Sequence, residues 1–179
     1  MAEPPEVVKR ECVFRGKKVV LEVQTVRAAG RTSRREVVLH PGAVAILAFP
    51  EPDKVLMERI WRYALEREML EIPAGTLEPG EAPEACAARE LEEETGYRAG
   101  RLERLLAIHP SPGILSERLE VFLAHDLKAG KPRPEAGEQI EAVLVPIDEA
   151  LAMIQDGRVT DSKTVAALLF WERFMSESA

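Results

Sequence analysis

The segment 83–95 constrains the fold more tightly than any other part of the chain, because both of its ends carry helix signals. Pro83 suits the first turn of a helix, and Gly96 suits the position just past the last turn. The spacing therefore predicts one helix over 83–95. We expect its core-facing side to carry residues spaced three apart, namely Ala85, Ala88 and Leu91.

The same predicted helix carries Glu90, Glu93 and Glu94, which lie three and four positions apart and therefore project from one side. Like charges at this spacing repel one another, at a cost of a few tenths of a kcal/mol per pair. A bound cation reverses the sign of that interaction, and Mg²⁺ and Mn²⁺ prefer oxygen ligands. Two interpretations remain open at this point, a divalent metal site or an acidic face that is simply solvated.

The acidic excess of the chain is concentrated around this helix. The 179 residues include 24 Lys plus Arg and 31 Asp plus Glu, which gives a formal net charge of −7. Residues 78–94 hold seven acids and one base, so they carry −6 of that charge and the rest of the chain is nearly neutral. An acidic chain lacks the Lys/Arg excess that displaces counterions from nucleic acid, so we expect no nucleic-acid partner.

The rest of the chain combines many short β runs with few helices, which predicts an α+β fold with helices covering a mixed sheet. Residues 43–49 are continuously apolar, as expected for a strand buried on both faces. The break at His40-Pro41-Gly42 separates an N-terminal β region from the remainder. Strands are predicted over 7–14, 17–26, 34–39, 43–49, 55–61, 70–73, 101–109, 118–124 and 140–145, and helices over 147–155 and 163–174. The last helix has apolar residues at helical spacing: Val165, Leu168, Leu169 and Phe174.

No targeting or membrane segment is visible in the sequence. The first six residues are acidic and proline-rich, and no apolar run approaches the roughly 20 residues that a membrane span needs. Cys12 and Cys86 do not make a disulfide framework. We therefore expect a cytoplasmic protein without a membrane partner.

Eight positions of the acidic segment follow a known pattern, G-x5-E-x7-R-E-U-x-E-E-x-G-U, in which U is a bulky apolar residue. The matching residues are Gly75, Glu81, Arg89, Glu90, Leu91, Glu93, Glu94 and Gly96, and Tyr97 replaces the usual aliphatic residue at the last position. The segment thus resembles the Nudix box. The resemblance implies a Nudix α/β/α sandwich over 42–179, preceded by a small antiparallel β subdomain over 1–41.

The resemblance also implies a site for two or more Mg²⁺ or Mn²⁺ ions at a diphosphate. The implied metal ligands are the Ala74 carbonyl and the carboxylates of Glu90, Glu93, Glu94 and Glu138. Arg89 is expected to pair with Glu81 and so to hold the carboxylate side of the helix in place. Either Glu93 or Glu138 would orient or deprotonate the attacking water, and the resemblance leaves the choice of base open.

Features outside the box resemble the ADP-ribose diphosphatase branch of the family. Pro112 falls sixteen residues after Gly96, which is a mark of that branch. The implied substrate contacts are Arg35, Glu36, Arg62, Ser111 and Gly113. An aromatic residue that stacks on adenine often stands at the Arg35 position, and a guanidinium can also stack on a base.

The predicted activity is hydrolysis of ADP-ribose to AMP and ribose 5-phosphate. An alternative is hydrolysis of another nucleotide diphosphate such as GDP-mannose, a UDP-sugar or FAD. A different class of function is an ADP-ribose sensor without catalysis, but sensors that regulate transcription need a DNA-binding appendage, and the residues after the catalytic region are not basic. The branch further implies a homodimer in which the N-terminal β subdomain crosses to the partner.

Overall fold

A computed structural model describes residues 4–133 and 139–176 of the chain. The chain divides into two compact units, one of Met1–Gly42 with His109–Arg118 and one of Ala43–Ile108 with Leu119–Ala179. The predicted domains over 1–41 and 42–179 stay a prediction, and the grouping of 109–118 with the first unit is a feature that the sequence did not indicate.

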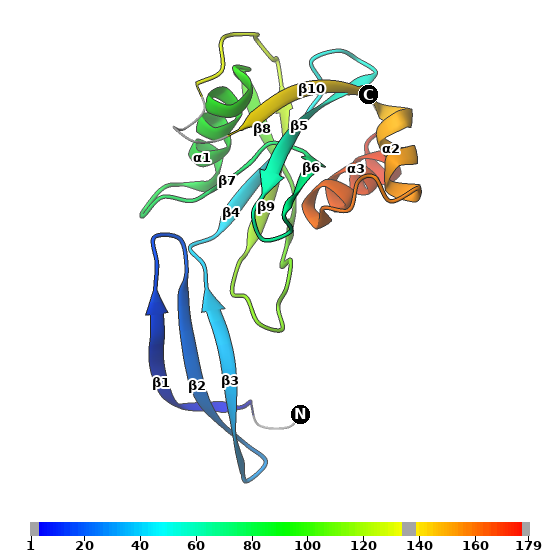
Figure 1. The fold of residues 1–179 in the computed structure, drawn as a ribbon. Coiled ribbons are helices and arrows are strands. Elements are labelled where there is room, and N and C mark those ends of the chain that lie inside the picture. The colour runs from blue at the N-terminus through cyan, green and yellow to red at the C-terminus, as the bar shows by residue number, and fades with distance from the viewer. Residues whose placement is uncertain (1–3, 134–138, 177–179) are drawn as a thin grey trace. The chain divides into compact units, whose positions relative to one another are not determined.

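The first unit is a three-stranded antiparallel sheet in the order β1-β2-β3 (Figure 1). Its strands are β1 (Glu6–Arg15), β2 (Val20–Ala28) and β3 (Arg31–Leu39). Ala29 and Gly30 form the tight turn between β2 and β3 with φ angles of 46° and 72°, a conformation that favours glycine. The segment 109–118 is bonded to the end of β3, because the Val38 N–H donates to the Ile114 carbonyl at 2.8 Å.

The second unit contains two sheets. One has the order β7-β4-β9-β8 and is mixed, since β4 runs parallel to β9 and the other pairs are antiparallel. The other is antiparallel in the order β10-β5-β6. The strands are β4 (Ala43–Ala48), β5 (Lys54–Arg62), β6 (Arg67–Glu71), β7 (Ala74–Thr76), β8 (Arg101–Ile108), β9 (Leu119–His125) and β10 (Ile140–Pro146).

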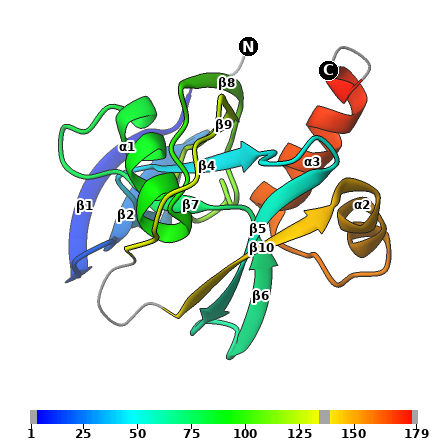
Figure 2. The ribbon, with the colours of Figure 1, turned by 90° about the horizontal axis from the view of Figure 1, so that it is seen from above.

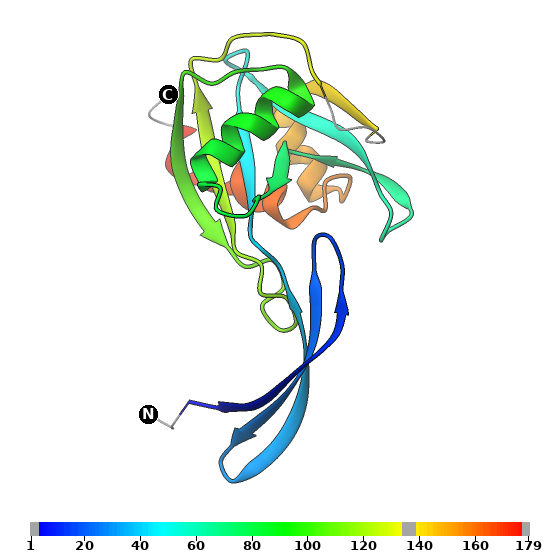
Figure 3. The same cartoon turned by 90° about the vertical axis from the view of Figure 1, so that its left-hand side faces the viewer.

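Strand β4 is buried on both faces, as its continuous apolar run predicted. Alternate residues point to opposite sides of a strand. Ala43, Ala45 and Leu47 therefore pack in the cluster that includes the two C-terminal helices. Val44, Ile46 and Ala48 pack in the cluster that includes the N-terminal helix of this unit. Figure 2 shows α1 and α3 on opposite sides of β4, and Figure 3 shows α1 lying across one face of the sheet. The predicted α+β class and layered architecture are confirmed.

The predicted helix over 83–95 is present, but it changes character along its length. Residues Pro83–Glu90 form α1, and Leu91–Thr95 form a π-helical turn, η1, that ends at Gly96 with φ 77°. The expected core face was wrong for Ala85 and Ala88, which are exposed. Cys86, Ala87 and Leu91 face the core instead. In an alanine-rich helix several sides are apolar, so spacing alone does not decide which side meets the sheet.

The two remaining helices are α2 (Ile147–Gln155) and α3 (Ser162–Phe174). Asp161 caps α3, since its carboxylate accepts the Thr164 N–H at 3.0 Å. Leu168 is buried as predicted, but Leu169 and Phe174 are exposed rather than part of the core. No helix within residues 4–133 and 139–176 combines the length and apolarity needed to cross a membrane.

Candidate active site

Gly75 lies in close contact with the side chain of Glu90. Strand β7 runs beside α1, and a Cβ atom built on Gly75 would lie 1.9 Å from Cδ of Glu90. Any side chain at this position would displace the carboxylate. Glycine is therefore required here by close approach of the Glu90 side chain, and this packing holds Glu90 over the β7 backbone.

Glu94 is buried on η1, with 7% of its surface exposed. Its Oε2 accepts the backbone N–H of Ala74 at 3.2 Å, which ties the π-helical turn to β7. Glu90 and Glu94 are thus both held against residues 74–75, the loop end of the predicted box. The predicted backbone ligand, Ala74, and two of the predicted carboxylate ligands are brought together in the second unit.

Arg89 organises the acidic side of the helix. Its Nε and Nη2 atoms donate to the two oxygens of Glu81 at 2.9 and 3.0 Å, so the predicted Arg89–Glu81 pair is present. Its Nη1 donates to Glu90 Oε1 at 2.8 Å and to Glu93 Oε2 at 3.1 Å. The bond from Arg89 lowers the pKa of Glu81 to about 2, so this carboxyl stays ionised at neutral pH.

Glu92 and Glu93 differ in their partners although they are adjacent. Glu92, which is not a pattern position, accepts a hydrogen bond from Arg98 at 2.5 Å. The Glu93 side chain bonds to Arg89, while its backbone carbonyl accepts the Arg133 N–H at 2.7 Å. An open pocket of about 340 Å³ is lined by Arg89, Glu92, Glu93 and Arg133.

A second charged cluster lies on β5, β6 and α3. Arg62, at the end of β5, donates to both oxygens of Glu71 at 2.8 and 2.6 Å. Lys163 of α3 also donates to Glu71, and it pairs with Asp161 at 3.0 Å. Burial opposes ionisation of Glu71, but Arg62 and Lys163 outweigh it and lower the pKa of this carboxyl. The predicted substrate residue Arg62 is therefore held in a fixed orientation by a buried acid.

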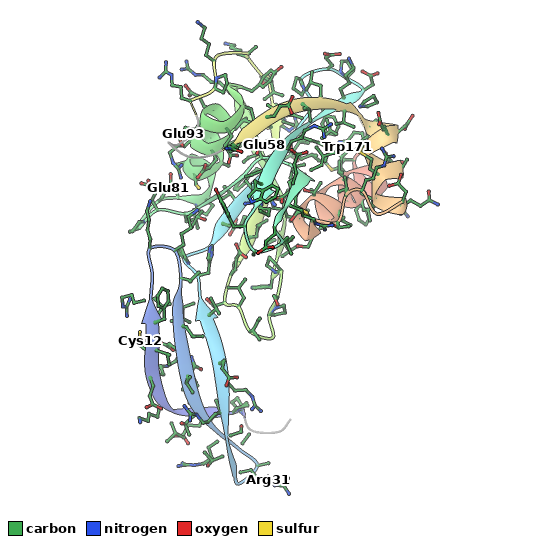
Figure 4. The ribbon with its side chains drawn as sticks, in the orientation of Figure 1. Cys12, Arg31, Glu58, Glu81, Glu93 and Trp171 are labelled. Atoms are coloured by element: carbon green, nitrogen blue, oxygen red, sulfur yellow. The ribbon has the colours of Figure 1, made fainter. Side chains whose placement is uncertain are left out.

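Glu58 connects the two clusters and was not singled out from the sequence. It lies directly across the sheet from Glu71, and its side chain is hydrogen-bonded to Glu94. Only 2% of Glu58 is exposed, and burial raises its pKa to about 8. Figure 4 labels Glu58 on β5, with Glu93 on the neighbouring helix. The one signal in the sequence is that Glu58 is an acid directly after the apolar residues 55–57 of the predicted strand.

The donors fit a divalent cation, although they do not yet form a finished metal cluster. Among the described residues no three His, Cys, Asp or Glu side chains converge on one point. Arg89 Nη1 forms ion pairs with both Glu90 and Glu93 and supplies positive charge beside them. The fit rests on all-oxygen donors, on the Gly75 cradle around Glu90 and on the buried oxygen Glu58 Oε1, which has no hydrogen-bond partner.

The other predicted site residues lie elsewhere in the chain. Arg35 and Glu36 are on β3, and Ser111 and Gly113 are in the loop bonded to its end, so all four belong to the first unit. Arg35 is exposed, and its Nη1 donates to the Arg34 carbonyl at 2.8 Å. Their contact with substrate stays a prediction. Glu138 lies outside the described residues.

A glycine-bounded loop, a helix with clustered carboxylates and the mixed sheet beneath them together define the class of this protein. Residues 39–168 match the NUDIX domain family, and the chain belongs to that family. It is 42% identical over 168 residues to the ADP-ribose pyrophosphatase of Bacillus subtilis (strain 168), covering 92% of this chain and 91% of the relative. It is 40% identical over 168 residues to the methanol dehydrogenase activator of Bacillus methanolicus, with the same coverage.

The fold has a solved counterpart. A crystal structure of an ADP compounds hydrolase superposes with a TM-score of 0.88 at 22% identity, covering 100% of this chain and 98% of the other. At this identity the likeness concerns the fold. The family and architecture inferred from the box are confirmed.

Proposed function

We propose that this protein hydrolyses the diphosphate of ADP-ribose to AMP and ribose 5-phosphate, with Mg²⁺ or Mn²⁺ as cofactor. The observation that carries the proposal is the placement of Glu90 over Gly75 and of Glu94 on the Ala74 N–H. This is where the NUDIX pattern expects its metal ligands. The similarity over 92% of the chain to a protein named ADP-ribose pyrophosphatase supports the choice of substrate.

Each residue has a role that follows from its contacts. Two or more bound divalent ions would neutralise charge on the diphosphate and lower the pKa of the attacking water. Glu90, Glu94 and the Ala74 carbonyl would hold these ions, and Glu138 is proposed as a further ligand. The Glu93 side chain is more exposed than that of Glu90, at 38% against 14%, so it is suited to accept a proton from water or to orient it. Glu138 is the alternative group for that task.

Arg89 and Arg62 are proposed to have different roles. Arg89 fixes the helix acids through its paired bonds to Glu81, and metal binding would require Glu90 and Glu93 to turn from its Nη1. Arg62, oriented by two bonds to Glu71, is proposed to bind the diphosphate or the terminal ribose. Arg35, Glu36, Ser111 and Gly113 are proposed as the remaining substrate contacts.

The test is a substrate panel with the purified protein. ADP-ribose, GDP-mannose, UDP-glucose and FAD are each incubated with Mg²⁺ or Mn²⁺, and products are separated by chromatography. We expect AMP and ribose 5-phosphate from ADP-ribose, and loss of turnover in Glu90→Gln and Glu94→Gln. Glu92→Gln is the matched control, because Glu92 lies on the same turn but pairs with Arg98. Full activity of Glu90→Gln and Glu94→Gln would exclude this mechanism.

The similarity to a protein named methanol dehydrogenase activator favours a second candidate, action on a dehydrogenase. Adding the protein to an assay of methanol dehydrogenase tests it. A rate increase that persists in Glu94→Gln would assign a function that does not depend on hydrolysis. A rate unchanged by the wild-type protein would leave hydrolysis as the function.

A homodimer is proposed from the first unit. Every residue of β1 is exposed, and its apolar side chains include Val13 at 61% and Phe14 at 57%. An exposed strand with apolar side chains is a surface that proteins normally cover. Light scattering at micromolar concentration is expected to give twice the mass of the chain, and a monomer would contradict the proposal. Cytoplasmic location stays a prediction.

A further inference from the structure

We propose that Glu58 is an additional carboxylate of the metal centre, and that its Oε1 binds the divalent cation that Glu94 holds. The inference rests on the proposed function, since it adds a ligand to the metal site described there. It concerns a residue on β5, outside the box that defines the family.

The first argument is an unsatisfied atom. In the described part of the chain, Glu58 Oε1 is the buried side-chain oxygen or nitrogen that has no hydrogen-bond partner. Buried polar atoms are almost always paired, because an unpaired one loses its hydration without compensation. An acceptor-only oxygen in this position requires a donor or a cation that the protein does not itself supply.

The second argument is location. Glu58 is hydrogen-bonded to Glu94 on η1 and lies across the sheet from Glu71 on β6. The carboxylate therefore lies beside a buried predicted metal ligand, Glu94, which is 7% exposed.

The third argument is charge. The group around Glu58 contains four acidic side chains, of Glu58, Glu71, Glu94 and Asp161, and two basic ones, Arg62 and Lys163, so acidic groups outnumber basic groups there. Buried charge without compensation is costly. A divalent ion would supply positive charge where the acidic groups exceed the basic ones.

The fourth argument is that the neighbouring cations already have partners. Both donors of Arg62 nearest this cluster bond to Glu71, and Lys163 bonds to Glu71 and Asp161. Neither of them makes a hydrogen bond to Glu58 Oε1. A purely structural ion pair would direct one of these donors to that atom. Glu58 Oε1 instead has no donor from either of these cations.

The experiment measures Mn²⁺ binding to the full-length protein without substrate, from the electron paramagnetic resonance signal of free Mn²⁺. We expect Glu58→Gln to weaken binding about 10-fold or more, since loss of a group that supports a metal ligand typically costs ~10–100-fold in affinity. The matched control is Glu141→Gln, an exposed carboxylate next to Ala142, the β10 partner of Glu58. It removes the same charge from the same sheet and is expected to bind Mn²⁺ as the wild type does.

Two further variants separate this inference from the proposed function. If Glu90→Gln and Glu94→Gln lose Mn²⁺ binding but Glu58→Gln is weakened less than 10-fold, the inference is wrong and the metal centre stands. If Glu90→Gln and Glu94→Gln bind Mn²⁺ normally, the metal centre is wrong as well. If Glu58→Gln and Glu141→Gln lose Mn²⁺ affinity equally, the loss is a general effect of charge on the sheet. That result would overturn the inference.

Folding of the variants is checked by circular dichroism. Glu58→Val provides a second variant that removes the carboxylate without adding a polar group. It is expected to show the same loss of Mn²⁺ affinity, and wild-type affinity in either folded variant contradicts the role of Glu58.

Discussion

Replacing Glu58 by Gln is expected to stabilise the metal-free protein at neutral pH. Burial raises the pKa of Glu58 from 4.5 to about 8. The folded state therefore keeps a proton that the unfolded state has lost between these two pH values. The contribution of this proton to the free energy of unfolding is therefore fully present below pH 4.5 and decreases as the pH rises toward 8. Gln keeps the shape of the side chain and has no proton to lose.

The magnitude follows from the same linkage. At pH 7 the difference between a pKa of 4.5 and about 8 corresponds to about 3 kcal/mol of folding free energy. The advantage of Glu58→Gln should therefore be about 3 kcal/mol at pH 7 and below about 1 kcal/mol at pH 5. Stabilisation by this change would also mean that Glu58 costs stability in the metal-free state, as residues of functional sites often do.

The assay is urea unfolding at pH 5, 6, 7 and 8 in the presence of EDTA. Fluorescence reports on the second unit, because both Trp61 and Trp171 belong to it. Glu141→Gln serves as the control and should follow the wild type at every pH, since its carboxylate is exposed. Parallel stability curves for the wild type and Glu58→Gln, or a less stable Glu58→Gln at pH 7, would refute the reasoning.

Three further changes test other parts of the site. Gly75→Ala should lower kcat for ADP-ribose ~100-fold, because a Cβ would lie 1.9 Å from Glu90 Cδ; unchanged kcat in the folded variant would contradict the cradle. Lys163→Met should lower the free energy of unfolding by ~3–5 kcal/mol, because Glu71 loses a buried partner; urea unfolding measures this, and a change under 1 kcal/mol would count against it. Glu81→Gln should weaken Mn²⁺ binding ~10-fold through loss of its paired bonds, and resonance titration checks it, with wild-type affinity as the contrary result.

The strands and helices were largely predictable from local patterns. The apolar run at 43–49 corresponds to a buried strand in the structure, whereas the strand predicted over 34–39 begins earlier, at Arg31. The helix ends at Pro83 and Gly96 were also correct. These features depend on neighbouring residues and on backbone preferences, which the sequence displays directly. The π-helical turn was not predictable, because no local signal distinguishes it from the last turn of an α-helix.

The residues of the box also show which features local sequence predicts and which it does not. Spacing along one helix predicted that Glu90, Glu93 and Glu94 share a side, and it placed Arg89 near Glu81 through the resemblance. It did not predict that Arg89 would bond to Glu90 and Glu93. The spacing also did not explain why position 75 requires glycine. That requirement depends on the distance between β7 and the helix.

Short-range spacing along the chain was enough to predict the family, the class of fold and the carboxylates of the box. The meeting of Glu58, Glu71 and Lys163 beside Glu94, in contrast, is a property of the tertiary structure. These residues are up to 105 positions apart, counted from Glu58 to Lys163. Strand pairing and helix docking bring them together, and burial changes their charge chemistry. Neither effect follows from the order of residues alone.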